Sequence, residues 1–189
     1  MSVTAVIGGQ WGDEGKGKIV DYLCRDADIV ARYQGGANAG HTVYINNTKL
    51  ILHQIPSGIL RENCHCILGN GMVVDPVGLV EEIEILKKMK INITDRIHIA
   101  LNAHIVTPCH KMRDMLNESG SDNKIGTTLK GIGPAYVDKY NRKGILAFEI
   151  LQQDKLKKSV FDQYNKLFNE NDLTGKQLKY LNQMITEFL

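Results

Sequence analysis

The segment from Gly8 to Lys18 has the composition of a phosphate-binding loop. It reads Gly-Gly-Gln-Trp-Gly-Asp-Glu-Gly-Lys-Gly-Lys and directly follows the apolar run Val3–Ile7. Glycines let backbone N–H groups converge on an anion, and a helix that begins at the lysines points the positive end of its dipole at the same charge. From Gly12 the spacing matches the P-loop pattern, with Gly17 and Lys18 in its glycine and lysine positions.

The loop departs from that pattern after Lys18. The next residue is Ile19, so the serine or threonine hydroxyl that normally contacts magnesium is absent. Asp13 and Glu14 are the nearest oxygen donors that could replace it. A carboxylate beside a triphosphate is unfavourable unless a metal neutralises it or it takes up a proton. Asp13 therefore needs a chemical role.

Two later segments offer further ligand-binding groups. Residues 34–42 read Gln-Gly-Gly-Ala-Asn-Ala-Gly-His-Thr and combine an approachable glycine backbone with the amide of Asn38, the imidazole of His41 and the hydroxyl of Thr42. They follow an expected strand, so they should emerge at the same sheet edge as the first loop. Residues 126–136 again mix glycines with hydroxyls and a cation, Lys130.

The elements that must position these loops alternate between strands and helices. Apolar runs and turn signals predict strands at Val3–Gly9, Asp28–Gln34, Cys66–Leu68 and Arg96–Leu101, and helices at Lys16–Arg25, from Asp75-Pro76 onward and at Pro108–Asn117. The strand Cys66–Leu68 is expected to end at Gly69-Asn70-Gly71, and Thr42–Ile45 and Leu50–His53 should form a hairpin around Asn46-Asn47.

The second half of the chain changes character twice. Glycines and a proline interrupt any period over residues 119–144, which predicts a long loop region of the kind that is usually functional or disordered. Beyond Leu146 the chain is expected to be helical. We therefore predict an α/β fold with a mostly parallel sheet flanked by helices, P-loop-like and incomplete in this chain. Residues 1–145 would form the nucleotide-binding core, and residues 146–189 the truncated start of a helical subdomain.

Composition restricts the class of protein. The 189 residues are 43% hydrophobic and 23% charged, as in ordinary soluble domains, and the net charge of +2 gives no reason to expect a nucleic acid or a membrane as partner. The sequence shows neither a membrane-spanning run nor a signal peptide, which favours a cytoplasmic location. Cys64-His65-Cys66 lacks a second ligand pair for zinc, so the four cysteines are expected to be buried, reduced thiols.

Taken together, these motifs resemble the adenylosuccinate synthetase family. The matching pieces are GGQWGDEGKGKIVD (8–21), RYQGGANAGHT (32–42), HQIPSGIL (53–60), GNGMVVDP (69–76) and GTTLKGIGPAY (126–136). The resemblance extends to about Gly144 and weakens in the helical tail. It implies a GTP-dependent ligase of purine biosynthesis that condenses inosine monophosphate (IMP) with L-aspartate, giving adenylosuccinate, GDP and phosphate with magnesium.

The resemblance also implies residue roles. Asp13 would be the base that takes the N1 proton of IMP, so that O6 attacks the γ-phosphate of GTP and forms 6-phosphoryl-IMP. His41 would be the acid or hydrogen-bond donor to the transferring phosphoryl group, and Asp13 with the carbonyl of Gly40 would hold the metal. The implied GTP contacts are Gly12, Asp13, Glu14, Gly15, Lys16, Gly17, Lys18, Gly40, His41 and Thr42. The implied IMP contacts are Asp13, Glu14, Gly15, Lys16, Asn38, Ala39, Gly40, His41, Thr128 and Arg142, the last donated across a homodimer interface.

Some observations leave alternatives open. Lys130 stands where the family often has arginine, and members of the family are considerably longer, so this chain alone is expected to lack guanine-binding and aspartate-binding residues and to be inactive. A phage-type relative that joins aspartate to a guanine nucleotide is a second interpretation, against which Asp13 argues. A nucleotide-binding module without turnover is a third. Without the resemblance, Asn38 fits a left-handed turn and Arg142 a solvated charge, and the other histidines are expected to be structural.

Overall fold

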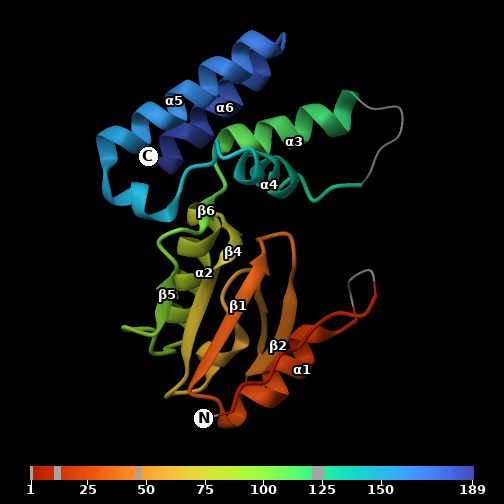
Figure 1. The fold of residues 1–189 in the computed structure, drawn as a ribbon, viewed down its shortest axis with the longest axis vertical. Coiled ribbons are helices and arrows are strands. Elements are labelled where there is room, and N and C mark those ends of the chain that lie inside the picture. Colours follow the sequence, from red (N-terminus) through yellow and green to blue (C-terminus); the bar gives the residue numbers. More distant parts are fainter. Residues whose placement is uncertain (1, 11–13, 46–47, 121–125) are drawn as a thin grey trace.

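The computed structural model describes residues 2–10, 14–45, 48–120 and 126–189, and it has two layers. A sheet and its flanking helices form the lower layer in Figure 1, and helices α3 to α6 form the upper one. The strands of the main sheet are β1 (Ile29–Gly35), β4 (His65–Val74), β5 (Ile97–Ile99) and β6 (His104–Ile105); β2 (His41–Ile45) and β3 (Thr48–Leu52) form a hairpin. All pairings in the main sheet are parallel, and the hairpin is antiparallel. The predicted α/β fold with a parallel sheet is confirmed.

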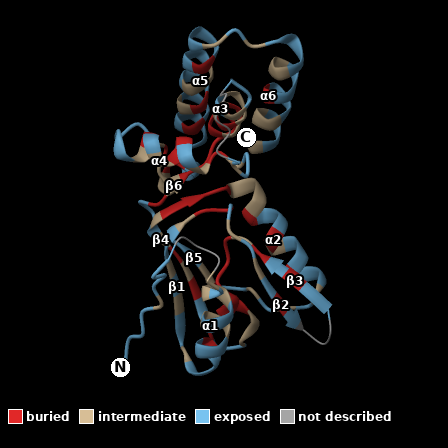
Figure 2. Cartoon of the chain, turned by 90° about the vertical axis from the view of Figure 1, so that its right-hand side faces the viewer, coloured by how far each residue is buried: buried red, intermediate tan, exposed pale blue. Residues whose placement is uncertain are grey.

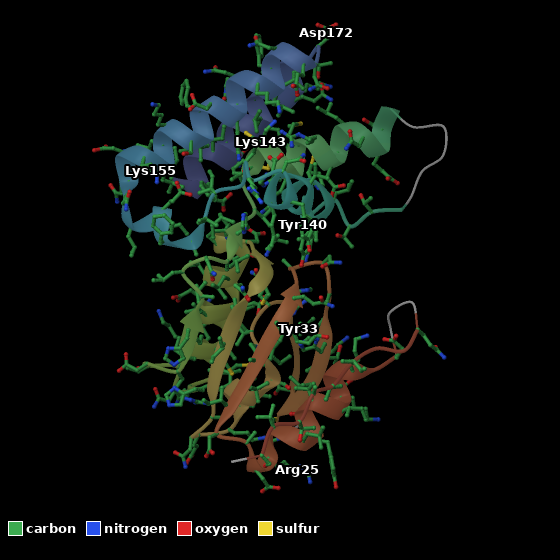
Figure 3. The ribbon with its side chains drawn as sticks, in the orientation of Figure 1. Arg25, Tyr33, Tyr140, Lys143, Lys155 and Asp172 are labelled. Carbon is green, nitrogen blue, oxygen red and sulfur yellow. The ribbon has the colours of Figure 1, made fainter. Side chains whose placement is uncertain are left out.

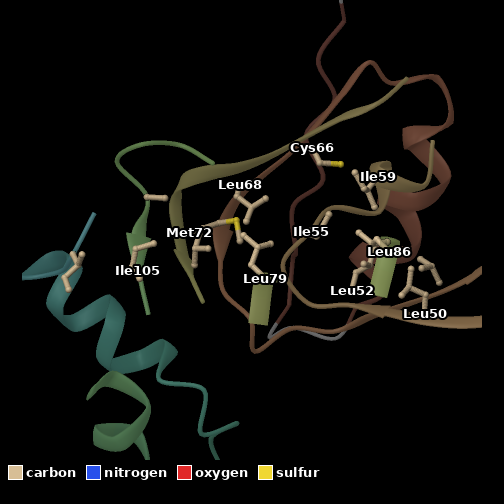
Figure 4. Packing of buried hydrophobic residues seen from close by; sticks show 14 of the residues in the cluster. Leu50, Leu52, Ile55, Ile59, Cys66, Leu68, Met72, Leu79, Leu86 and Ile105 are labelled. Atoms are coloured by element: carbon tan, nitrogen blue, oxygen red, sulfur yellow. The ribbon is translucent and has the colours of Figure 1, made fainter. Parts of the chain in front are cut away.

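One face of the sheet carries the main hydrophobic core. Cys66 and Leu68 alternate with more exposed residues along β4, and both side chains are fully buried. Leu52 of β3 and Leu86 of α2 pack in the same cluster (Figure 4). Burial of this face therefore holds the hairpin and α2 (Pro76–Lys88) against the sheet.

The helices match several predicted segments. They are α1 (Lys16–Leu23), α2, α3 (Pro108–Gly120), α4 (Ile132–Tyr140), α5 (Gln153–Glu170) and α6 (Gly175–Phe188), with short 3-10 turns η1 (Cys24–Asp26), η2 (Ser57–Leu60) and η3 (Ala147–Leu151). The helical character beyond Leu146 is confirmed, and α5 and α6 pack on α3 through Leu167, Leu181 and Met112. The predicted division at residues 145/146 stays a prediction.

The predicted strand Val3–Gly9 is wrong for this structure. Residues 2–8 have no regular secondary structure, and Val3 and Ile7 are 93% and 74% exposed. An apolar run becomes a strand only where neighbouring strands take up its N–H and C=O groups, and no described strand pairs with this segment. Figure 2 shows the N-terminal trace as an exposed segment apart from the sheet.

The predicted end of a strand at Gly69-Asn70-Gly71 is also wrong. β4 continues to Val74, and its register against β1 shifts between Arg32 and Gln34. At this irregularity the strands approach so closely that a Cβ on Gly71 would lie 2.0 Å from the carbonyl oxygen of Tyr33. The glycines therefore permit a close strand pairing instead of ending the strand.

The long loop predicted over residues 119–144 contains helix α4. Gly131 caps this helix in the left-handed conformation, with φ of 72°, and Pro134 lies in the first turn, where its missing N–H costs nothing. The same glycine and proline that suggested a loop therefore start a helix. Residues 126–131 remain irregular.

Other predictions concern the cysteines, the hairpin and the membrane. All four cysteines are buried and free of disulfides, as expected. The hairpin strands are confirmed, whereas its Asn46-Asn47 turn lies outside the described residues. No helix in the described part of the chain has the length and apolarity needed to cross a membrane.

Candidate functional site

The loop of residues 34–42 begins at the carboxyl end of β1. The side chain of Arg32, a residue of that strand, supports it with hydrogen bonds. The guanidinium of this half-buried residue donates to the carbonyl of Gly36 at 2.8 Å, to that of Gln34 at 3.3 Å, and to that of His53. Burial lowers the pKa of Arg32 below its ordinary value. A charged donor that satisfies three carbonyls fixes the path of the loop. The sequence motif contained Arg32, but its residue type alone did not reveal this role.

A second support comes from His53, just beyond β3. Its Nδ1 donates to the carbonyl of Ala39 at 2.8 Å. This bond holds the residue before Gly40, whose backbone is exposed. His53 was expected to be structural, and its contact with the loop agrees with that expectation.

The first two glycine-rich loops meet at His41. A Cβ on Gly17 of α1 would lie 2.7 Å from the Cβ of His41, so the first turn of α1 lies directly against the first residue of β2. Burial lowers the pKa of His41, and the positive charges of Arg32 and His53 lower it further. The two segments therefore meet through α1 and β2, but not at one sheet edge as predicted, because residues 3–9 form no strand.

The start of α1 brings Glu14 and Lys16 of the first loop together. Lys16 forms an ion pair with Glu14, whose other carboxylate oxygen accepts the backbone N–H of Gln10 at 3.0 Å. Gly15 takes the left-handed conformation with φ of 80°, and its carbonyl accepts the N–H of Lys18 at 3.0 Å. Gly12 and Asp13, the central residues of the predicted phosphate site, lie outside the described residues.

The third segment, residues 126–136, contacts the loop at the carboxyl end of β1 through hydrogen bonds. The ammonium of Lys130 donates to the carbonyl of Ala37 at 3.0 Å. The hydroxyl of Tyr136 accepts the N–H of Gly35 at 2.8 Å and donates to the carbonyl of Gly71 at 2.9 Å. Tyr136 thus links α4 to both β1 and β4. It was part of the quoted motif, but only its contacts reveal that it positions the loop.

Helix α4 is itself anchored by a buried ionic network. His110 donates through Nε2 to Asp138 at 3.0 Å, and Arg113 lies 3.3 Å from the same carboxylate. The hydrogen bond from His110 lowers the pKa of Asp138, and the charge of Arg113 lowers it further. Arg142 follows the helix, exposed and with φ of 58°. The structure does not bring it to the loops, and its predicted role across a dimer stays a prediction.

The remaining residues that were predicted to contact nucleotides are accessible to solvent. Asn38, Thr42 and Thr128 are exposed, and Ala39 is half-buried. The loops thus offer amides, hydroxyls, an imidazole and a helix N-terminus on an accessible surface, which is the donor set that phosphate groups bind. A cavity of about 610 Å³ adjoins these loops: residues of β3, α2, α3 and α6 line it together with Ala37, His53, Leu129 and Lys130.

A parallel α/β sheet with a glycine-rich loop beside a helix N-terminus is typical of nucleotide-binding proteins. The family model for adenylosuccinate synthetase matches residues 5–188. The chain belongs to the adenylosuccinate synthetase family.

Comparisons with individual proteins support the same family. Adenylosuccinate synthetase of Pelodictyon phaeoclathratiforme is 50% identical over 172 residues, which cover 89% of this chain and 40% of that protein. The solved, fully ligated adenylosuccinate synthetase of Plasmodium falciparum matches with a TM-score of 0.78 and 37% identity, over 95% of this chain and 42% of that one. A succinoaminodeoxyadenylate synthetase of cyanophage S-2L, bound to dGMP and dATP, matches with a TM-score of 0.60 and 25% identity, over 76% and 40%. The chain therefore spans about two-fifths of the length of these relatives.

Proposed function

We propose that this chain supplies nucleotide-binding loops of a GTP-dependent ligase that joins IMP to L-aspartate, giving adenylosuccinate, GDP and phosphate. The observation that carries the proposal is the contact between Gly17 and His41. It places a helix N-terminus suited to triphosphate beside an imidazole that can donate to a phosphoryl group in transfer. Membership of the family supports the same assignment.

The proposed chemistry has two steps. Asp13 takes the proton from N1 of IMP, and the electron pair moves to O6, which attacks the γ-phosphorus of GTP while GDP leaves. The amino group of L-aspartate then attacks C6 of 6-phosphoryl-IMP, the C6–O bond breaks, and phosphate leaves with the electron pair as the nitrogen loses a proton. Phosphorylation is needed because the carbonyl oxygen alone is a poor leaving group.

His41 is assigned to the first step as a hydrogen-bond donor. Its lowered pKa favours the neutral ring in neutral solution, and a neutral imidazole still carries one N–H. That N–H can stabilise the negative charge on the transferring phosphoryl group. Holding the ring against Gly17 keeps this donor beside the helix that we assign to GTP.

Magnesium is assigned to the carboxylate of Asp13 and the backbone carbonyl of Gly40. The described residues contain no group of three or more His, Cys, Asp or Glu side chains that could hold a metal ion. Magnesium does not need one, because it binds through one or two protein oxygens, water and substrate phosphates, and the Gly40 backbone is exposed. When bound, the ion neutralises phosphate charge.

The substrate contacts follow the family pattern. We assign GTP to residues 12–18 and 40–42, and IMP to residues 13–16 and 38–41 with Thr128. Arg142 would reach the IMP phosphate of a neighbouring subunit in a homodimer, consistent with its exposure after α4. We further propose that the enzyme acts in the cytoplasm.

Isotope labelling tests the function. A chimera would continue this chain with the C-terminal part of the Pelodictyon protein that it does not match, and would receive GTP, L-aspartate and IMP labelled with heavy oxygen at O6. The label should appear in released phosphate, because C6–O cleavage follows phosphorylation. Retention of the label in the nucleotide would exclude the 6-phosphoryl intermediate. The 189-residue chain alone should show no turnover.

The same chimera separates the alternatives. Higher identity and TM-score with the Plasmodium synthetase than with the cyanophage enzyme favour IMP over a guanine nucleotide as acceptor. Turnover with deoxyguanosine monophosphate in place of IMP would instead assign the chain to the phage-type reaction. Nucleotide binding without turnover in the chimera would leave a binding module.

A further inference from the structure

Residues 126–131, the first part of the third segment, are held at both ends by carboxylates of α3. Asp114 accepts the backbone N–H of Gly131 at 2.9 Å, and Glu118 accepts that of Gly126 at 2.8 Å. The two acidic residues are four positions apart in the helix, so their side chains lie on one face of it. We call Asp114 and Glu118 the carboxylate clamp.

The clamp holds two backbone positions that glycine adopts far more readily than other residues. Gly126 and Gly131 have φ of 74° and 72°, in the left-handed region. Gly131 also packs directly on α3, because a Cβ there would lie 2.7 Å from the backbone of His110. Asp114 is 6% exposed, so its bond to Gly131 is shielded from water, and a charged acceptor makes such a bond stronger than a neutral one. Both ends of the segment are thus fixed.

Helix α4 has no capping side chain of its own at its start. Its N-cap residue is Gly131, which has no side chain that could accept a hydrogen bond. Asp114 accepts the N–H of this residue from the neighbouring helix, and its negative charge complements the positive end of the α4 dipole. The glutamate of a capping box makes the same bond within one helix. The start of α4 is therefore positioned by α3.

The clamped segment lies directly against the loop of residues 34–42. Lys130 donates to the carbonyl of Ala37 at 3.0 Å, and Ala37 is buried. Ile132, at the start of α4, packs on the same loop, because a Cβ on Gly36 would lie 2.7 Å from its Cδ1 atom. The positions that the clamp fixes on α3 therefore determine how the two segments face each other.

Both segments carry a residue that we assign to IMP. Thr128 lies on the clamped segment and Asn38 on the loop of residues 34–42, and both are exposed. Figure 3 shows the two layers to which they belong, with Tyr140 of α4 in the upper layer and Tyr33 of β1 in the lower one. A nucleotide that contacts both residues spans the boundary between the layers. Its affinity therefore depends on how well the clamp holds the upper segment in place.

We propose that Asp114 and Glu118 are positioning residues for IMP. They do not contact the nucleotide. They hold residues 126–131 so that the hydroxyl of Thr128 meets the same IMP molecule as Asn38. A segment that is fixed before the substrate arrives loses little conformational entropy on binding, which strengthens the binding. The inference rests on the proposed function, because the assignment of Thr128 and Asn38 to IMP comes from it.

Removal and restoration of each acceptor test the clamp in the chimera. Asp114→Leu and Glu118→Met abolish the bonds to the two glycines and should each raise KM for IMP by about tenfold, as for the loss of one hydrogen bond. We expect kcat and the KM for GTP to stay within about twofold, because the residues assigned to GTP lie on the other two loops. Asp114→Asn and Glu118→Gln keep an acceptor oxygen and should restore most of the affinity for IMP.

Glu84→Met is the matched control. Glu84 is an exposed carboxylate of α2 that pairs with Lys87, and its replacement should leave all three kinetic parameters unchanged.

Hydrogen exchange of the 189-residue chain gives a measurement that needs no substrate. The amides of residues 126–131 should exchange faster by about tenfold or more in Asp114→Leu, and those of β4 at the normal rate. Normal exchange in β4 shows that the variant has folded. If Asp114→Leu does not fold, Glu118→Met decides the question, because its bond lies closer to solvent.

The other outcomes separate this inference from the proposed function. An unchanged KM for IMP in both variants of an active chimera overturns the inference and leaves the proposed function standing. Equal losses in Asp114→Leu and Asp114→Asn would mean that the charge and not the hydrogen bond matters, which also overturns it. A chimera without turnover that binds IMP in calorimetry, and binds it more weakly after Asp114→Leu, supports the clamp and contradicts the proposed function. A chimera that neither binds IMP nor turns over contradicts both.

Discussion

The loops of residues 8–18 and 34–42 contain similar residues, but the fold supports them very differently. Arg32 and His53 hold the carbonyls of the second loop from inside the molecule, and Lys130 reaches it from the third segment. The first loop follows a segment in which Val3 and Ile7 are exposed, and its Glu14 and Lys16 pair with each other. One loop is therefore preorganised by half-buried donors, whereas the other has no paired strand before it.

The difference in support between the two loops shows what a glycine-rich loop needs in order to hold one conformation. Glycines allow a backbone to surround an anion, but they also give it many other conformations. A guanidinium that satisfies several carbonyls removes that freedom, as Arg32 does for residues 34–36. For the first loop, no described strand pairs with residues 3–9 to supply such a constraint.

The largest expected effect concerns the first loop. Asp13→Asn in the chimera should lower kcat by about 10³-fold, because an amide cannot remove the N1 proton. Steady-state kinetics measure the loss, and thermal unfolding should show an unchanged Tm. Asp26→Asn, on the exposed end of η1, is the matched control and should keep the normal rate. A near-normal rate for Asp13→Asn would show that another group is the base.

The next effect concerns the second loop. Arg32→Met should lower the free energy of unfolding by about 3 kcal/mol, because the carbonyls of Gln34, Gly36 and His53 lose a charged donor. Urea denaturation measures this change. Hydrogen exchange should become faster at residues 34–42 and stay unchanged at residues 8–18; equal changes in both would contradict the contrast between the loops.

Arg25→Met is the control for this substitution. Arg25 is exposed and lies 4.9 Å from the ring centre of Tyr22. Its replacement should cost less than about 1 kcal/mol, as for an exposed cation–π contact.

A smaller effect is the pH dependence that His41 contributes. Its pKa is lowered in the folded chain, so the unfolded chain binds the proton more readily. The contribution of His41 to stability is therefore complete above the ordinary histidine pKa and is lost as pH falls from that value through the lowered one. Wild-type stability should decrease relative to His41→Gln over this range in urea titrations, and an NMR titration should give a midpoint below the ordinary value. A midpoint above it would contradict the proposed surroundings of the ring.

The smallest effect should come from the segment before the first loop. Ile7→Ser should change the free energy of unfolding by less than about 0.5 kcal/mol, because the side chain is already 74% exposed. Leu52→Ala in the buried core should cost about 3 kcal/mol under the same urea denaturation. A large loss for Ile7→Ser would show that residues 3–9 are packed in solution.

Much of the fold could be predicted from local patterns. The hairpin, α2 and α3 were recognisable because alternation, caps and helical spacing act over a few residues. The continuation of β4 through Gly71 and the start of α4 at Gly131 were not, because a glycine allows both a turn and a close approach. Which of the two occurs depends on the partner strand or helix.

The site divides in the same way. Residue types and spacing alone predicted that residues 8–18 and 34–42 bind phosphate and that Asp13 needs a role, and they indicated a family that the comparisons confirm. The supports of those loops, Arg32 and Tyr136, became visible only through the carbonyls that they contact. Only the tertiary structure left Val3–Ile7 without a neighbouring strand. The chemical groups of a motif can be recognised from residues that are neighbours in the sequence. Burial and strand pairing cannot, because they depend on segments that are far apart in the sequence and meet only in the folded chain.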